Sequence, residues 1–275
     1  MDQQYILKAI DAALAAGEKI LSIYNNPNSD FQVRKKADNS PLTIADRAAH
    51  EVICRLLADT PYPILSEEGK SKSYEERMAW KELWVVDPLD GTKEFIKRNG
   101  EFTVNIAFVQ DSVPCIGVVY LPVKRVLYFA MEGVGAYKMT DVASRGEVSL
   151  EDLIAKATRL PIETTKRNKY VIVASRSHST LETERFIEEA KAVHPNVELI
   201  SCGSSIKICL VAEGVADVYP RFASTMEWDT AAGRAIARAA GMEIYQAGMD
   251  VPLSYNKKDL LNPWFIVEPK RVGHK

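Results

Sequence analysis

The spacing of apolar residues predicts two helices at the start of the chain. Between Ile6 and Tyr24, apolar side chains recur every three or four residues, which places them on one face of a helix. Asn25-Asn26-Pro27 ends this helix. A second helix with the same kind of pattern is expected after Asn39-Ser40-Pro41, and Pro61 closes it.

The pattern then changes to that of β-strands. Residues 102–108 alternate between large apolar and smaller side chains, which is the period-two pattern of a strand. Short gaps between the apolar runs favour an antiparallel meander, so the first part of the chain indicates an α+β layer. The predicted strands are Ile64–Leu65, Leu83–Val86, Phe102–Phe108, Cys115–Tyr120 and Val126–Ala130.

Strands and helices alternate after a polar stretch at residues 141–167. This alternation predicts helices that cover a mixed sheet. We therefore expect an N-terminal α+β domain at residues 1–160 and a C-terminal α/β domain at residues 161–275. The predicted strands are Tyr170–Ala174, Val197–Ser201, Ala216–Tyr219, Met242–Tyr245 and Trp264–Val267, and the predicted helices are Leu181–Val193, Ser204–Ala212 and Asp229–Ala240.

Composition and charge narrow the class of protein. With 275 residues, 47% of them hydrophobic and 26% charged, the chain is neither disordered nor fibrous. A net charge of -2 gives no general attraction to nucleic acid or to acidic membranes. No spanning segment or secretory signal is visible, so we expect a cytoplasmic protein. Weak attachment to the inner face of the membrane and the oligomeric state stay open.

The cysteines agree with a reducing compartment. None of the four belongs to a Cys-x-x-Cys pair, and each lies in an apolar run. We expect buried, reduced thiols rather than a redox or metal site. They are Cys54, Cys115, Cys202 and Cys209.

The segment Asp87-Pro88-Leu89-Asp90-Gly91-Thr92 carries the densest candidate chemistry. It follows an apolar strand, and Pro88 and Gly91 favour a turn. Two carboxylates on one tight turn cannot both stay ionised and close together without a cation between them. Oxygen ligands alone favour Mg²⁺ over zinc. The alternative is an Asp-Pro turn with solvated carboxylates.

Two further acidic segments support the metal interpretation. Glu67-Glu68 follows another short strand, and Asp229 lies at the start of an alanine-rich helix. By themselves, the glutamates are typical of a solvated loop and Asp229 of a helix N-cap. If Glu67, Asp87, Asp90 and Asp229 converge, they can hold two or three Mg²⁺ ions about 4 Å apart, an arrangement used for displacement at phosphorus.

Three segments together resemble the inositol monophosphatase superfamily of Mg²⁺-dependent, lithium-sensitive phosphatases. They are Glu67-Glu68, Asp87–Thr92 and Trp228-Asp229-x-Ala231-Ala232-Gly233. Longer stretches are similar to the bacterial 3'(2'),5'-bisphosphate nucleotidases of the CysQ type. These stretches are Lys36–Thr43, Gly91–Ile96, Asn99–Asn105, Ser175–His178, Gly203–Lys207 and Tyr219–Phe222.

The resemblance implies a role for each matched residue at the metal centre. Glu67, Asp87 and the carbonyl of Leu89 correspond to ligands of a first Mg²⁺, and Glu67 also corresponds to a ligand of a third, weaker ion. Asp87, Asp90 and Asp229 correspond to ligands of the second. Thr92 resembles the threonine that bonds the attacking water, and Asp46 the carboxylate that pairs with it. The catalytic residues are then Asp46, Thr92 and Glu67. Without the family, Thr43-x-x-Asp46 reads as a capping box of the second helix.

The resemblance also implies a substrate pocket. His178 corresponds to a residue beside the nucleotide, and Gly203-Ser204-Ser205 opens a helix whose N–H groups suit an anion. Lys207 and Arg221 correspond to the site of a second, non-reacting phosphate, although each alone would usually be solvated charge. The implied substrate contacts are Glu67, Leu89, Asp90, Gly91, Thr92, His178, Ser204, Lys207, Arg221 and Asp229.

These assignments imply a sugar-phosphatase fold with αβαβα layers and two subdomains. The implied reaction removes the 3'-phosphate of 3'-phosphoadenosine 5'-phosphate (PAP), giving AMP and phosphate. The sulfated nucleotide (PAPS) is a further implied substrate, and sulfur assimilation the implied process. Two alternatives are an inositol or sugar monophosphatase, against which Lys207 and Arg221 argue, and a non-catalytic regulator that binds phosphorylated ligands. The intact set of carboxylates with Thr92 argues against the regulator.

Overall fold

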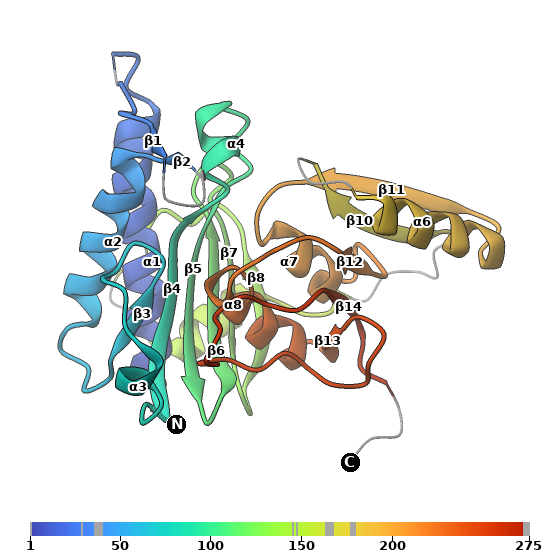
Figure 1. Cartoon of the computed structure of the whole chain (residues 1–275). Helices are drawn as coiled ribbons and strands as arrows, with labels where there is room; N and C mark the ends of the chain where they lie inside the picture. The colour runs from blue at the N-terminus through green and yellow to red at the C-terminus, as the bar shows by residue number, and fades with distance from the viewer. Residues whose placement is uncertain are drawn as a thin grey trace.

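The computed structural model describes residues 2–28, 30–35, 41–144, 146, 148–162, 168–176 and 180–271. Its first two helices are α1 (Gln3–Tyr24) and α2 (Ile44–Leu57). They lie side by side against one face of the large sheet (Figure 1). Both helices were predicted from apolar spacing, and both are confirmed.

The large sheet has seven strands in the order β3-β4-β5-β6-β7-β8-β9. Only the β3–β4 pair is parallel, and the rest form the predicted antiparallel meander. The last two strands were not predicted, because one begins at a glycine and the other has two residues. The strands are β3 (Ile64–Ser66), β4 (Glu82–Asp90), β5 (Thr103–Gln110), β6 (Val113–Leu121), β7 (Val126–Met131), β8 (Gly135–Met139) and β9 (Thr158–Arg159).

Two helices of the later part of the chain cover the other face of this sheet (Figure 1). They are α7 (Ile206–Glu213) and α8 (Glu227–Ala239). The approach of α8 is very close at Gly117 of β6, where a Cβ would lie 2.3 Å from the carbonyl oxygen of Ala232. Any larger residue at position 117 would therefore push α8 off the sheet.

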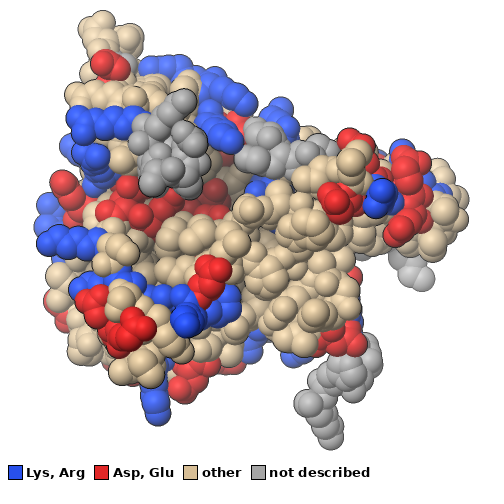
Figure 2. Space-filling model, in the orientation of Figure 1, with Lys and Arg blue, Asp and Glu red and all other residues tan. Residues whose placement is uncertain are grey.

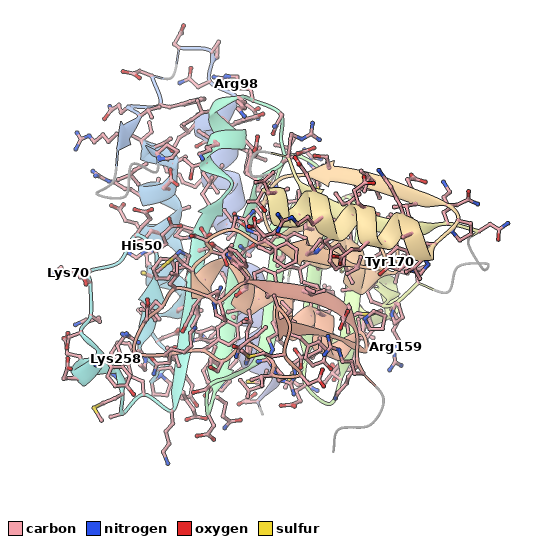
Figure 3. All side chains as sticks on the ribbon, turned by 45° about the vertical axis from the view of Figure 1, so that its right-hand side comes forward. His50, Lys70, Arg98, Arg159, Tyr170 and Lys258 are labelled. Carbon is pink, nitrogen blue, oxygen red and sulfur yellow. The ribbon has the colours of Figure 1, made fainter. Side chains whose placement is uncertain are left out.

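One mixed sheet was predicted for the part of the chain after residue 160, but the hydrogen bonds there form two small sheets. One is the parallel pair β10 (Tyr170–Ser175) and β11 (Val197–Cys202), with α6 (Leu181–Val193) beside it in Figures 1 and 3. The other has the order β12-β14-β13. A bridge between Ile172 and Val218 connects the two. The strands of the second sheet are β12 (Tyr219–Arg221), β13 (Met242–Gln246) and β14 (Phe265–Pro269).

Across the molecule, helix and sheet layers alternate in the predicted αβαβα order (Figure 1). Apolar residues from both parts of the chain share the core between the large sheet and α7 and α8. The division into domains at residue 160 stays a prediction. The remaining short elements are β1 (Arg34–Lys35), β2 (Pro41–Leu42), α3 (Tyr74–Arg77), α4 (Thr92–Ile96) and α5 (Leu150–Lys156).

Candidate active site

The turn from Asp87 to Thr92 begins inside β4. The strand was expected to end at Val86, but it continues to Asp90, because a bulge separates the Asp87 and Asp90 pairings with β5. The backbone N–H of Leu89 donates to Oδ1 of Asp87 at 3.0 Å. Gly91 has φ +97°, and a Cβ there would lie 3.1 Å from the carbonyl oxygen of Glu101, so this position requires glycine.

Four predicted carboxylates come together around this turn. Asp87 is only 1% exposed, and its pKa is raised well above the usual value, first by burial and then by Glu67, Asp90 and Asp229. Glu67 follows β3, and its N–H donates to the carbonyl of Val86 at 3.1 Å. Burial, followed by the charges of Asp90 and Glu67, raises the pKa of Asp229 to about 8.

Asp229 lies in the first turn of α8 and is not its N-cap. The helix begins at Glu227, earlier than predicted, and the Asp229 carboxylate accepts from the N–H of Met226 at 2.8 Å. It therefore helps to cap the helix from its third position, while the rest of the carboxylate faces the acidic cluster.

The acidic cluster fits a hard divalent cation. All the donors are oxygen atoms, and buried like charges are unfavourable unless a cation or protons neutralise them. Among the residues that the structure describes, no three acidic, histidine or cysteine side chains already form a metal-ligand group. Figure 2 shows acidic side chains gathered in the middle of this face of the molecule.

Asp46 makes the contacts that both of the roles considered for it require. Its Oδ2 accepts from the N–H of Thr43 at 2.8 Å and from the Thr43 hydroxyl at 2.5 Å, which completes the capping box of α2. Its Oδ1 accepts from the hydroxyl of Thr92 at 3.1 Å. The Thr92 hydroxyl also lies 3.4 Å from the carbonyl oxygen of Leu89. Asp46 is 1% exposed, so the start of α2 fixes the orientation of Thr92 from inside the protein.

A cavity of about 240 Å³ joins residues from both parts of the chain. Asp46, Asp87 and Leu89 do not line the cavity and lie buried in the protein. His178 lies outside the described residues. The predicted residues that line the cavity are Glu67, Asp90, Gly91, Thr92, Ser204, Lys207, Arg221 and Asp229.

The two predicted cations are buried rather than solvated. Lys207 is 4% exposed, its Nζ donates to the carbonyl of Ser204 at 2.6 Å, and burial lowers its pKa. Arg221 is 9% exposed and donates through Nη2 to the carbonyl of Ser224 at 3.0 Å. Within the described part of the chain, Nε of Arg221 and the Ser204 hydroxyl are buried without a hydrogen-bond partner. These polar atoms suit an anionic ligand in the cavity.

The loop before α7 differs from its prediction. The helix begins at Ile206 and not at Ser204. The N–H of Gly203, predicted to suit an anion, donates instead to Oε2 of Glu101 at 2.9 Å. A Cβ on Gly203 would lie 2.8 Å from the carbonyl oxygen of Glu101, so the loop is held tightly against the earlier part of the chain.

The contacts of Ser205 and Asn105 with the acidic cluster were not predicted. The Ser205 hydroxyl lies 2.7 Å from both Oδ2 of Asp90 and the carbonyl oxygen of Asp229. The side-chain amide of Asn105 donates to Ser205 at 2.9 Å and to Asp90 at 3.3 Å. The signal for Asn105 was a single amide in the otherwise apolar run Val104-Asn105-Ile106. Together they connect the end of β4 to the start of α8.

We expect the metal-free protein to lose stability as the pH rises. Folding raises the pKa of Asp87 and Asp229, so between about pH 4 and pH 8 the folded protein binds more protons than the unfolded chain does. Each shifted carboxyl loses up to about 1.4 kcal/mol of stability per pH unit in this range, and each kcal/mol lowers Tm by roughly 2–4 °C. Thermal unfolding in EDTA at pH 5 and pH 8 measures the loss, and Mg²⁺ should raise Tm at pH 8. A higher Tm at pH 8 than at pH 5 in EDTA would contradict the prediction.

Comparison with known proteins adds independent observations. The inositol monophosphatase family pattern matches residues 2–274. The 3'(2'),5'-bisphosphate nucleotidase CysQ of Escherichia coli K12 is 45% identical over 255 residues, which are 92% of this chain and 94% of that protein. The CysQ of Buchnera aphidicola is 39% identical over 86% of this chain and 82% of its own length.

Solved structures agree with the sequence relatives. The crystal structure of CysQ from Bacteroides thetaiotaomicron, a bacterial member of the inositol monophosphatase family, superposes with a TM-score of 0.92 at 64% identity and covers 98% of both chains. The suhB protein of Bartonella henselae has the same fold, with a TM-score of 0.73 at 24% identity over 97% of this chain and 94% of its own. No helix among the described residues is long and apolar enough to cross a membrane. From its sequence pattern, its relatives and its fold, this chain belongs to the inositol monophosphatase family.

Proposed function

We propose that this protein is a Mg²⁺-dependent 3'(2'),5'-bisphosphate nucleotidase, which hydrolyses the 3'-phosphate of PAP to give AMP and phosphate. The observation that carries the proposal is one cavity with a cluster of carboxylates and two buried cations, Lys207 and Arg221. Such a cavity suits a ligand with two phosphates, one to be cleaved and one to be held. The CysQ relatives, with 45% identity for the Escherichia coli protein, support the same activity.

The proposed reaction is displacement at phosphorus by water. Glu67, Asp87, the Leu89 carbonyl, Asp90 and Asp229 would hold two or three Mg²⁺ ions. When bound, Mg²⁺ lowers the pKa of a water molecule and neutralises charge on the phosphate. The Thr92 hydroxyl donates a hydrogen bond to Asp46, so the lone pairs of its oxygen are free to accept a hydrogen bond from the attacking water. Glu67, at the cavity wall, shares in orienting that water.

The remaining contacts would hold the nucleotide. Lys207 and Arg221 bind the 5'-phosphate, and the buried hydroxyl of Ser204 adds a hydrogen bond. Gly91 allows close approach of the substrate to the turn, and His178 is proposed beside the nucleotide. PAPS fits the same pocket, because its 5' group also carries a negatively charged phosphate. The proposed role is in sulfur assimilation, by clearing an inhibitory by-product, and the four free cysteines agree with a cytoplasmic site of action.

Phosphate release from PAP and from inositol 1-phosphate, each with and without Mg²⁺, tests this proposal. We expect rapid release from PAP only when Mg²⁺ is present, and much slower release from inositol 1-phosphate, which offers no second phosphate to Lys207 and Arg221. Faster hydrolysis of inositol 1-phosphate would favour a monophosphatase. Binding of PAP without any release in the presence of Mg²⁺ would favour a regulator.

Replacing Arg221 by alanine should raise KM for PAP by about 10- to 100-fold. A charge-assisted hydrogen bond contributes about 1.5–3 kcal/mol, and contacts to a non-reacting group act on the ground state and the transition state alike. Hydrolysis of adenosine 3'-phosphate, which lacks the 5'-phosphate, should hardly change in the same variant. Steady-state kinetics on both substrates decides. Equal losses on both would assign Arg221 to the metal centre or to the fold.

A further inference from the structure

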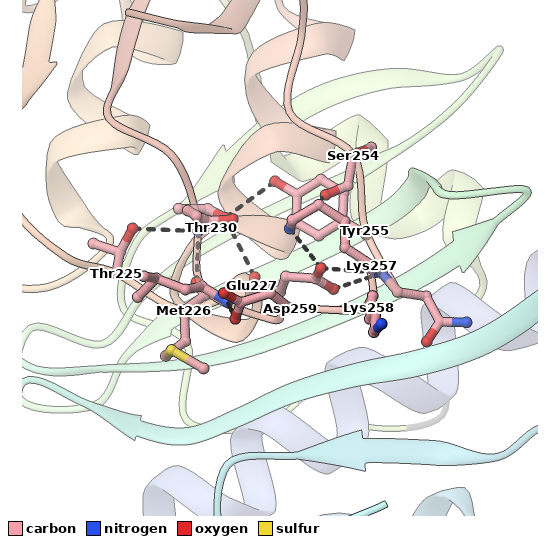
Figure 4. A network of polar contacts seen from close by, with 12 residues as sticks. Thr225, Met226, Glu227, Thr230, Ser254, Tyr255, Lys257, Lys258 and Asp259 are labelled. Carbon is pink, nitrogen blue, oxygen red and sulfur yellow. Dashed lines mark hydrogen bonds and ion pairs between the residues drawn. The ribbon is translucent and has the colours of Figure 1, made fainter. Parts of the chain in front are cut away.

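Glu227 is a completely buried carboxylate at the first position of α8. It is 0% exposed, and it does not belong to the described residues that line the cavity. Its carboxylate accepts hydrogen bonds from the N–H of Asn256 at 2.6 Å, from the N–H of Lys257 at 3.0 Å and from the Lys257 ammonium at 2.6 Å (Figure 4). Three donors from one loop therefore converge on this side chain.

The same loop, residues 254–262, is bonded to the start of α8 at further points. The N–H of Glu227 donates to the carbonyl of Leu260 at 3.0 Å. The side-chain amide of Asn262 donates to the carbonyl of Met226 at 2.7 Å. The Tyr255 hydroxyl donates to the hydroxyl of Thr230 at 3.1 Å. The loop thus holds the residues before Asp229 (Met226 and Glu227) and the residue after it (Thr230).

The loop is also attached to the segment that follows Glu67. Arg77 of α3 donates through Nη1 to the side-chain oxygen of Asn256 at 2.7 Å, and the Asn256 amide donates back to the carbonyl of Arg77 at 2.9 Å. Figure 3 shows Lys258 of this loop beside α3. Loop 254–262 therefore connects α3, which follows Glu67 in the chain, with α8, which carries Asp229.

We propose that Glu227 is a positioning residue, which fixes the Asp229 carboxylate for metal binding by holding loop 254–262 against the first turn of α8. This inference rests on the proposed function. A ligand carboxylate must be placed to within about 0.5 Å, and groups that orient ligands typically affect metal affinity by 10–100-fold. Glu227 provides this placement from two residues away without contacting the metal.

The test compares Glu227→Gln with wild type in titrations with Mn²⁺ by calorimetry. Glutamine retains the volume but replaces one of the two accepting oxygens by an NH₂ group, so at least one of the three donors of the loop loses its acceptor and the loop is held less firmly. We expect Kd for Mn²⁺ to rise about 10-fold, or about 1.4 kcal/mol. The Mg²⁺ concentration that gives half-maximal phosphate release should rise by the same factor. KM for PAP at saturating Mg²⁺ should stay unchanged, because Glu227 is remote from Lys207 and Arg221 in its contacts.

Glu213→Gln is the matched control. Glu213 is also a buried carboxylate, and it accepts from the Tyr128 hydroxyl at 2.7 Å and from the Lys138 ammonium at 2.6 Å. The Glu213→Gln variant should be less stable than wild type, with an unchanged Kd for Mn²⁺. If Glu227→Gln also loses stability with an unchanged Kd, the positioning role is overturned.

A second variant keeps the test decisive if Glu227→Gln fails to fold. Lys257→Met removes the ammonium contacts with Glu227 and with the carbonyl of Ser254, and it leaves both backbone donors to Glu227 in place. We therefore expect a rise of about 3-fold in Kd for Mn²⁺. An unchanged Kd in this variant would overturn the inference. Wild-type protein that binds no Mn²⁺ would instead overturn the proposed function itself.

Discussion

Replacing Asp229 by asparagine should lower phosphate release from PAP by about 10³-fold or more while the fold survives. Several kcal/mol of transition-state stabilisation depend on the metal ions that this carboxylate helps to hold, and each 1.36 kcal/mol corresponds to a factor of ten in rate. The asparagine oxygen can still accept from the N–H of Met226, so the helix cap remains. Removal of one charge from the acidic cluster also relieves repulsion with Asp90 and Glu67.

The matched control for this substitution is Asp152→Asn. Asp152 occupies the same capping-box position on α5, outside the cavity, and so reports any general cost of an asparagine there. Circular dichroism, Tm in EDTA and phosphate release on the three proteins provide the comparison. We expect the Tm of metal-free Asp229→Asn at pH 8 to equal or exceed that of wild type. Turnover near the wild-type rate in Asp229→Asn would exclude the proposed metal-assisted mechanism.

Thr92→Val should lower kcat by about 10²–10⁴-fold and leave KM for PAP and the affinity for Mn²⁺ nearly unchanged. This range is typical of a positioned group that takes part in proton transfer. Valine has the shape of threonine but cannot bridge a water and Asp46, whereas Thr92→Ser keeps the hydroxyl and should retain activity to within about tenfold.

Thr60→Val controls for the loss of a buried hydroxyl. The Thr60 hydroxyl donates to the carbonyl of Leu57 at 2.7 Å and accepts from the Trp84 indole at 2.9 Å, in a part of the protein outside the cavity. This variant should lower Tm without lowering kcat. If Thr92→Val raises KM and leaves kcat intact, Thr92 binds substrate and does not orient the water.

The parts of the fold with a strong local pattern could be predicted from the sequence. The apolar period of α1 and the alternation in β5 are local patterns of the sequence, and both elements appear in the structure. The apolar pattern was insufficient where hydrogen bonding to a neighbouring strand decides whether a residue belongs to a strand. Asp90 joins β4 only because it pairs with Thr103 after the bulge, and β9 exists only because Arg159 and Thr158 pair with β8.

The acidic residues of the candidate site could be predicted from the sequence, but the contacts that surround them could not. Asp87 and Asp90 lie on one short motif, so their proximity follows from the sequence. The contact of Ser205 with Asp90 joins residues 115 positions apart, and no local pattern encodes it. The burial of Lys207 was likewise unpredictable, because it depends on packing between α7 and the later strands.

The contact between Gly117 and α8 has a consequence for the exchange of parts between related proteins. A chimaera that joins residues 161–275 of a relative to this chain brings in a new helix at the position of α8, and that helix must accept a backbone approach that leaves no room for a Cβ at position 117. Compatibility therefore depends on small residues at positions 117 and 235, because the Ala235 side chain and the Ala232 backbone face Gly117, more than on average sequence identity. Grafts that keep both small residues should assemble, and grafts that enlarge either one should separate α8, and Asp229 with it, from the end of β4.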